Sequence, residues 1–120
     1  LNIFFIKNIE KNLLNYRWYM PGIARVGDTA AGTCSSHKNP QSVTGIITTG
    51  YADGTCDDKS IARVGDTVTF NCGHTGIITS GAQYSTAGDI SIAVLGSTVG
   101  PGTGNITATI TSCSPNSDVI

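Results

Sequence analysis

The sequence predicts an all-β domain built from three repeated strand-turn-strand units. The first observation is a hexapeptide that recurs along the chain: ARVGDT at 24–29, ARVGDT at 62–67 and a weaker copy, AVLGST, at 93–98. The second is a pentapeptide that follows each of them: TGIIT at 44–48, TGIIT at 75–79 and TATIT at 107–111. The third is the composition, because only 12% of the residues are charged and 15 are Gly, which favours short strands and tight turns over helices. Two phrases repeated in the same order indicate an internal triplication.

The segment before the first repeat, residues 1–19, has a different character. It holds five of the eight aromatic residues of the chain, and the only methionine, Met20, stands directly before the repeat begins. We favour the interpretation that the natural chain starts at Met20 and that residues 1–19 reflect a gene start assigned too early. The alternative is a short amphipathic helix that docks onto another surface. The expected organisation is therefore an N-terminal extension, 1–19, followed by one domain, 20–120.

Each unit is expected to contain a strand, a turn and a second strand. The stretch GIARVGD breaks at Gly27 and Asp28, which form a turn dipeptide. The stretch NITATITS at 105–112 alternates apolar and polar positions, as a half-buried strand does. Two segments of equal length, 50–61 and 81–92, separate the repeated phrases, so we expect them to be equivalent hairpins that turn near their Asp and Gly residues.

Both histidines of the chain lie close to a cysteine, in loops at the same place in the repeat. The longer loop of the first unit carries Cys34 and His37 with C-x₂-H spacing. The shorter loop of the second unit carries Cys72 and His74 with C-x-H spacing. If the repeat symmetry brings the two loops together, the four side chains form a Cys₂His₂ tetrahedron, a ligand set that suits zinc.

The other two cysteines leave the ligand assignment open. Neither Cys56 nor Cys113 has a histidine beside it, but either could replace Cys34 as a ligand. The competing interpretation is that the four cysteines form two disulfides or remain free, with both histidines idle. We favour zinc, because the start of the chain lacks the features of a signal peptide and disulfides are rare in a reducing cytoplasm. Few large apolar residues follow Met20, so the core is expected to be thin and to need such a staple.

Four charged residues recur at equivalent positions of the repeated hexapeptide: Arg25, Asp28, Arg63 and Asp66. The aspartates follow a glycine in a turn, so we expect them to stabilise the turn by accepting hydrogen bonds from nearby backbone. We expect the arginines to pair with them. A catalytic carboxylate pair is a much weaker interpretation of the same residues.

Several classes of function are disfavoured by the sequence. The net charge of −1 provides no clustered basic face, so no nucleic-acid partner is expected. No apolar stretch approaches the roughly 20 residues that span a membrane as a helix. A Cys72–His74 nucleophile pair is conceivable, but a thin β-domain offers little enclosed pocket, so we do not expect an enzyme.

The repeated phrases closely resemble the PAAR-repeat family over roughly residues 20–112. The resemblance is carried by MPGIARVGDT at 20–29, by TGIITTG at 44–50, and by SIARVGDTV and CGHTGIITSG within 60–81. It implies a small pseudo-threefold β-cone that caps and sharpens the blunt end of a trimeric β-helical spike. Family members typically hold a zinc ion near the apex, with histidine ligands and a cysteine. This chain has only two histidines, so a second cysteine must complete the site, and its third repeat lacks both Arg and Asp.

The function implied by this resemblance is mechanical. The protein is expected to be the tip of the central spike in a contractile phage tail, bound as one copy per spike trimer and in transient contact with the target cell envelope. Its location would then be the tail baseplate of a virion. The alternative is a tip or adaptor of a type VI secretion spike, made in the bacterial cytoplasm and secreted on the spike with a separate effector. The repeated Arg and Asp residues are expected to stabilise the repeat turns or to contact the spike.

Overall fold

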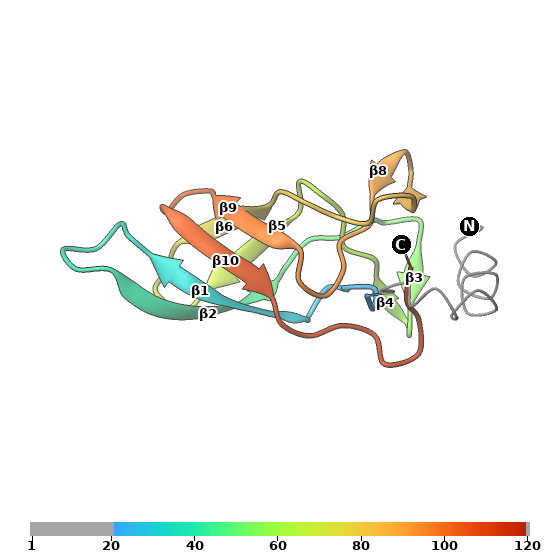
Figure 1. Cartoon of the computed structure of the whole chain (residues 1–120), viewed down its shortest axis with the longest axis horizontal. Helices are drawn as coiled ribbons and strands as arrows, with labels where there is room; N and C mark the ends of the chain where they lie inside the picture. The colour runs from blue at the N-terminus through green and yellow to red at the C-terminus, as the bar shows by residue number, and fades with distance from the viewer. Residues whose placement is uncertain (1–20, 120) are drawn as a thin grey trace, which may run out of the picture.

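The chain folds into an all-β domain (Figure 1). The computed structural model describes residues 21–119, and the extension predicted at 1–19 lies outside the described residues. The strands are β1 (Thr29–Cys34), β2 (Gln41–Ile47), β3 (Thr55–Cys56), β4 (Lys59–Ser60), β5 (Thr67–Phe70), β6 (Thr75–Ile78), β7 (Thr86–Ala87), β8 (Ile90–Ser91), β9 (Thr98–Pro101) and β10 (Ile106–Ile110). No helix among the described residues is long and apolar enough to cross a membrane.

Six of the strands close into an antiparallel barrel in the order β1-β10-β9-β6-β5-β2. Each repeat contributes one hairpin, and the first strand of the barrel pairs with the last, from Ala30 opposite Ile110 to Cys34 opposite Ile106. Buried and exposed side chains alternate along β10, as predicted for 105–112. Closure leaves no unpaired edge in the barrel, which removes a route to aggregation.

A closed ring of backbone hydrogen bonds connects the three units at one end of the barrel. The amide of Ala24 donates to the carbonyl of Ala93 at 2.9 Å, that of Ala93 to Ala62 at 2.8 Å, and that of Ala62 to Ala24 at 3.0 Å. All three alanines are fully buried. Each begins one copy of the repeated hexapeptide, so the triplication of the sequence corresponds to a pseudo-threefold arrangement of the backbone.

The repeated turn is the same in all three units. Its glycine has a positive φ in each copy, at 96° for Gly27, 98° for Gly65 and 88° for Gly96, a conformation that other residues adopt only with strain. In the first two units the next residue is an aspartate, whose Oδ2 accepts a hydrogen bond of 2.8 Å from the backbone three residues earlier. In the third unit Ser97 takes this place, and its Oγ accepts the equivalent bond from Val94 at 2.9 Å. The weaker third copy therefore keeps the turn with a different acceptor.

The two segments between the repeats form equivalent hairpins, β3–β4 and β7–β8, as predicted. Each turns through two residues with positive φ, Asp57 and Asp58 in one and Gly88 and Asp89 in the other. Such a pair of conformations is typical of the two-residue turns that match the twist of a β-hairpin.

The third equivalent of these hairpins is assembled from the two ends of the described chain. Gly22 pairs with Asp118 in an isolated antiparallel bridge. The amide of Val119 donates to the carbonyl of Pro21 at 3.0 Å, and Val119 is 1% exposed. The beginning and the end of the domain therefore meet where the other two units have a turn.

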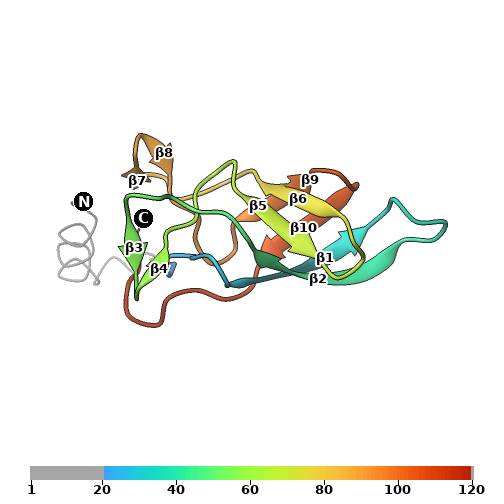
Figure 2. The same ribbon diagram turned by 180° about the vertical axis from the view of Figure 1, so that it is seen from behind.

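Two apolar clusters fill the molecule. The barrel interior contains Ala24, Ala30, Cys34, Val43, Ile47, Ala62, Val68, Phe70, Ile78, Ala93, Val99, Ile106, Ala108 and Ile110. The end that carries the hairpins contains Ile23, Cys56, Ile61, Ala82, Ala87, Ile92, Val94 and Val119. The β1–β2 loop projects at the opposite, narrower end of the molecule, while β3, β4, β8 and the C-terminus lie together at the broader end (Figures 1 and 2).

Candidate metal centre

Two loops at the narrow end bring the predicted ligands together. Cys34 is the last residue of β1, and His37 follows it in the β1–β2 loop. Cys72 and His74 belong to the short connection between β5 and β6. The four ligand atoms all lie within 4.8 Å of one another, so this group could hold a metal ion.

The distances within the group fit a tetrahedral site. Nδ1 of His74 lies 3.5 Å from Sγ of Cys34 and 3.7 Å from Sγ of Cys72. A tetrahedral ion of the size of zinc, with bonds of about 2.3 Å to sulfur and about 2.0 Å to nitrogen, separates two such donors by about 3.5 Å. The distances from His74 to the two sulfur atoms are therefore compatible with shared coordination of one metal ion.

His37 provides the fourth donor. Its Nε2 atom is buried and has no hydrogen-bond partner, although a buried polar nitrogen is normally satisfied. Its ring centroid lies 5.0 Å from that of His74, with the rings tilted by 52°. A metal ion between the loops would satisfy this nitrogen, which makes the group a better fit to a ligand site than to a set of idle side chains.

The third unit contributes no ligand, but it braces both ligand loops. The amide of Asn105 donates to Oγ of Ser36 at 2.7 Å, and its carbonyl accepts from the amide of Ser35 at 2.9 Å. A Cβ atom on Gly104 would lie only 2.4 Å from Cβ of His74, so the backbone of the third unit packs directly on this ligand. This contact could not be predicted from the sequence, because the third unit contributes no titratable side chain to it. The close approach of the backbone is indicated in the sequence only by a glycine, Gly104.

The other two cysteines lie outside the group. Cys56 ends β3 and belongs to the apolar cluster at the broad end. Cys113 lies beside Gly22, where an added Cβ would come within 2.4 Å of its Sγ. Burial, and to a smaller extent the charge of Asp28, raises the pKa of the Cys113 thiol. All four cysteines are free, and the disulfide interpretation finds no bonded pair among them.

The repeated charges lie at the broad end, on the other side of the barrel from the ligand loops. Arg25 is 8% exposed, and its Nε donates to Oδ2 of Asp28 at 3.0 Å and its Nη2 to Oδ1 at 3.1 Å. Its Nη1 donates to Oδ2 of Asp57 at 2.9 Å. The hydrogen bond to Asp28 is the main reason why the pKa of Arg25 is raised. Burial opposes the charge of Asp28, but hydrogen bonds from Arg25 and Ser112 outweigh it and lower the pKa of this carboxyl.

The sequence did not indicate that Asp57 connects different units. Its Oδ2 also accepts a hydrogen bond of 2.5 Å from Ser114, and this bond is the largest reason why the pKa of Asp57 is lowered. Ser114 in turn accepts from the amides of Asn116 and Ser117, both at 3.1 Å. One carboxylate therefore joins the first hairpin, Arg25 and the C-terminal segment.

The expected pairing of Arg63 with Asp66 is wrong for the side chains. The amide of Arg63 donates to Asp66, but the guanidinium turns to the next hairpin, where Nη1 donates to the carbonyl of Ala87 at 3.1 Å. Its Cζ atom lies 4.4 Å from the ring centroid of Tyr51. Gly88 occupies the position that Asp57 has in the first hairpin, so the second arginine has no carboxylate at this position.

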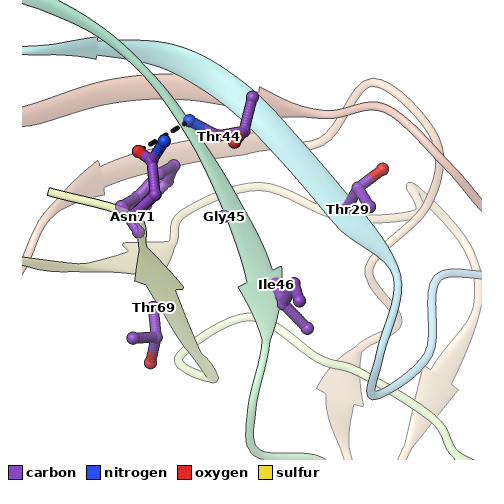
Figure 3. Close-up of a pocket in the computed structure, with 7 residues that line it drawn as sticks. Thr29, Thr44, Gly45, Ile46, Thr69 and Asn71 are labelled. Carbon is purple, nitrogen blue, oxygen red and sulfur yellow. Dashed lines mark hydrogen bonds between the residues drawn. The ribbon is translucent and has the colours of Figure 1, made fainter. Parts of the chain in front are cut away.

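The barrel wall carries two shallow depressions. The larger, of about 350 Å³, is lined by Thr29, Thr44, Gly45, Ile46, Thr69, Phe70 and Asn71. Figure 3 shows its side chains on β1, β2 and the end of β5. The backbone amide of Thr44 donates a hydrogen bond of 3.3 Å to Oδ1 of Asn71. A second depression, between β1, β9 and β10, is lined by Thr, Gly, Ala and Val. Neither contains a titratable side chain.

Comparisons with family models and with curated proteins gave no match for this chain. What the described residues can do therefore follows from their geometry. The narrow end can bind a metal ion through two sulfur and two nitrogen atoms from two units. The broad end presents three structurally equivalent hairpin positions around a closed ring.

Proposed function

We propose that the chain is a PAAR-repeat protein and forms the structural tip of the trimeric β-helical spike of a contractile phage tail. The observation that carries this proposal is the hydrogen-bonded ring of Ala24, Ala62 and Ala93, which places three equivalent units of one chain around a common centre. A trimer presents three equivalent patches at its end, and one chain can cover all three only with three similar surfaces. The tip would direct the force of sheath contraction onto a small area of the target envelope, without catalysis.

The orientation follows from the two ends of the molecule. The broad end carries the hairpins β3–β4 and β7–β8 and the split third hairpin, so it offers the threefold surface that would meet the spike. Two large apolar side chains on the second hairpin segment are exposed there, Tyr84 at 63% and Ile90 at 38%. The narrow end would then point away from the spike, toward the envelope.

We further propose that the metal ion at the narrow end is zinc. Two cysteines and two histidines match its preference for sulfur and nitrogen in a closed tetrahedral site. The ion would be held by Cys34 and His37 from the first unit and by Cys72 and His74 from the second. Coordination would tie these loops together where the barrel narrows, and ligand binding of this kind contributes directly to folding stability.

The alternative setting is a type VI secretion spike, with the chain as its tip or as an adaptor for a separate effector. The same threefold surface and metal centre would serve in that setting. The two settings differ in what the narrow end would meet. Recovery of the chain in purified phage particles would support the phage tail. Recovery of the chain with an effector in the secreted fraction would support the secretion spike.

The test of the proposed function is complex formation with a trimeric β-helical spike protein from the same genome. Native mass spectrometry of the co-expressed proteins is expected to show one copy of this chain per trimer. An Ile90→Asp substitution on the broad end should weaken the complex, whereas Thr44→Asp on the barrel wall, also an exposed position, should leave it intact. Absence of a complex, or three copies per trimer, would overturn the proposal.

A further inference from the structure

The candidate metal centre contains two thiols from different units. Sγ of Cys34 and Sγ of Cys72 lie within 4.8 Å of each other, and each lies close to the same nitrogen, Nδ1 of His74. The centre could therefore join the two loops in either of two ways, through a metal ion or directly through sulfur. A site with a single cysteine has only the first way.

The surroundings of the two thiols allow them to approach. A disulfide needs an S–S distance of about 2.0 Å, shorter than the spacing of two ligands to one ion. Cys34 is completely buried at the end of a strand, so its position is fixed. Cys72 is half-buried in a connecting turn beside Gly73, whose φ is 91°, and lies outside the barrel strands. The shift needed for bond formation therefore falls on a turn residue.

We propose that the tip is held by an exchangeable cross-link, which is a zinc site when both cysteines are reduced and a Cys34–Cys72 disulfide after oxidation by a peroxide. Ligand cysteines are thiolates, which is the reactive form of the side chain. The difference in burial gives the two thiolates different roles. Cys72 is the more accessible thiolate and reacts with the peroxide. Cys34 is the buried thiolate and attacks the oxidised sulfur of Cys72 to form the disulfide.

The electron balance of this exchange is complete. The Cys72 thiolate attacks one oxygen of hydrogen peroxide, the O–O bond breaks, hydroxide leaves and Cys72 becomes a sulfenic acid. The Cys34 thiolate then attacks this sulfur, the S–O bond breaks and a second hydroxide leaves. The two thiolates together supply the two electrons that reduce the peroxide. Only the two imidazoles remain as ligands, so the affinity for zinc falls while the loops stay joined.

The biological setting of this inference rests on the proposed function. A spike tip is made in a reducing cytoplasm. It is then driven toward an envelope where the concentrations of oxidants and metal chelators differ from those in the cytoplasm. A purely zinc-based tip would lose its cross-link wherever zinc is removed. A tip with two adjacent cysteines keeps a covalent connection between the same two loops under oxidising conditions.

The experiment uses the zinc-loaded protein with Cys56→Ala and Cys113→Ala, which remove the thiols outside the centre; alanine already occupies the position of Cys56 in the second hairpin. Hydrogen peroxide is expected to release about one zinc ion and to remove two thiols per chain. Peptide mass spectrometry should find a Cys34–Cys72 link within one chain, and dithiothreitol should restore both thiols and zinc binding. The oxidised, zinc-free protein should also melt at a higher temperature than the reduced protein stripped with a chelator.

A Cys72→Ser variant in the same background is the matched control, and it should show neither the internal link nor the gain in melting temperature. The proposal is overturned if peroxide yields sulfinic acids or links between chains, or if the thiols survive an excess of peroxide that oxidises free glutathione. Protein that never binds zinc but forms the link would also overturn the exchange. Because this experiment needs no spike, failure to bind a spike counts against the proposed function alone.

Discussion

Arg25 and Arg63 occupy the same position in two identical hexapeptides, but their guanidinium groups bind different partners. Arg25 forms ion pairs with Asp28 at 3.0 Å and with Asp57 at 2.9 Å. Arg63 instead lies over the ring of Tyr51 and donates to a backbone carbonyl. The difference arises in the neighbouring hairpins, since one turn offers an aspartate and the other a glycine. Identical sequence therefore gives the same backbone but different electrostatic surroundings.

Replacement of the two arginines should separate these roles. Arg25→Ala removes the charged partner of the buried Asp28 carboxylate and leaves it only the hydrogen bonds from Ser112 and the backbone amide, so we expect a loss of about 2–4 kcal/mol in the free energy of unfolding. Arg63→Ala removes one hydrogen bond and one aromatic contact, and should cost about 1 kcal/mol. Urea unfolding of both variants measures the difference. Equal losses would contradict the assignment of Arg25 as the more important residue.

Removal of any metal ligand should lower both metal content and stability. His37→Ala and Cys72→Ser are each expected to reduce bound zinc from about one ion per chain to nearly none and to lower the melting temperature. Elemental analysis and thermal melting with and without a chelator provide the measurements. Cys113→Ala is the control, since this cysteine lies outside the centre, and it should keep its zinc. Retention of zinc by His37→Ala would remove His37 from the ligand set.

The contact between the third unit and His74 can be tested at Gly104. An added Cβ would meet Cβ of His74 at 2.4 Å, so Gly104→Ala must displace either the ligand or its own loop. We expect metal affinity to fall by about 10–100-fold, the usual effect of disturbing a residue that orients a ligand. A competition titration with a chromophoric chelator measures this affinity. Thr107→Ala, on the exposed face of β10, should leave it unchanged.

Acidification should weaken the connection at Asp57. The pKa values of Asp28 and Asp57 are both lowered in the folded chain. These carboxylates therefore contribute fully above the unfolded value of about 4, and the contribution is lost as pH falls below it and through the folded values. With the metal chelated, the melting temperature should drop across this range. Asp57→Asn should lower it at neutral pH, and the gap to the unchanged protein should close at low pH.

The control for this comparison is Asp53→Asn, at an exposed position just before β3. The melting temperature of this variant should equal that of the unchanged protein at every pH. A gap between Asp57→Asn and the unchanged protein that stays constant down to about pH 2 would show that the carboxylate acts through its shape and not through its charge.

The meeting of the two ends predicts that the chain can be permuted. Val119 and Pro21 face each other where the other hairpins have two turn residues, so an Asn-Gly linker should join them as a hairpin turn. New ends opened between Gly88 and Asp89 would lie in an exposed turn, a position that tolerates interruption. The permuted protein should melt cooperatively, as judged by circular dichroism. Opening instead between Gly45 and Ile46, within the barrel strand β2, should prevent folding.

Much of the fold could be predicted because the repeats carry local information. The alternation of apolar and threonine residues at 105–112 located β10, and the equal spacing of 50–61 and 81–92 located the hairpins β3–β4 and β7–β8. The split third hairpin could not be found this way, because its two halves lie at opposite ends of the sequence. The turn role of Ser97 was also hidden, since a hydroxyl replaces the expected carboxylate while the hydrogen bond stays the same.

The candidate site shows the same limit. The spacing of Cys34 with His37 and of Cys72 with His74 identified the four donors that the structure brings together. The side-chain partners of Arg63 could not be read from its own repeat, because they depend on Tyr51 and Gly88 in other segments. The four donors could thus be predicted from short sequence motifs within each unit. Side-chain contacts between units could not, because they depend on how the units are arranged.

The ring of Ala24, Ala62 and Ala93 has a consequence for how a displacement of one unit affects the other two. Each alanine donates to one neighbour and accepts from the other, so displacing any one of them strains the two hydrogen bonds that connect it to both other units. In the proposed spike tip, a force on the narrow end would fall mainly on the loops of two units, and this ring would pass it to all three.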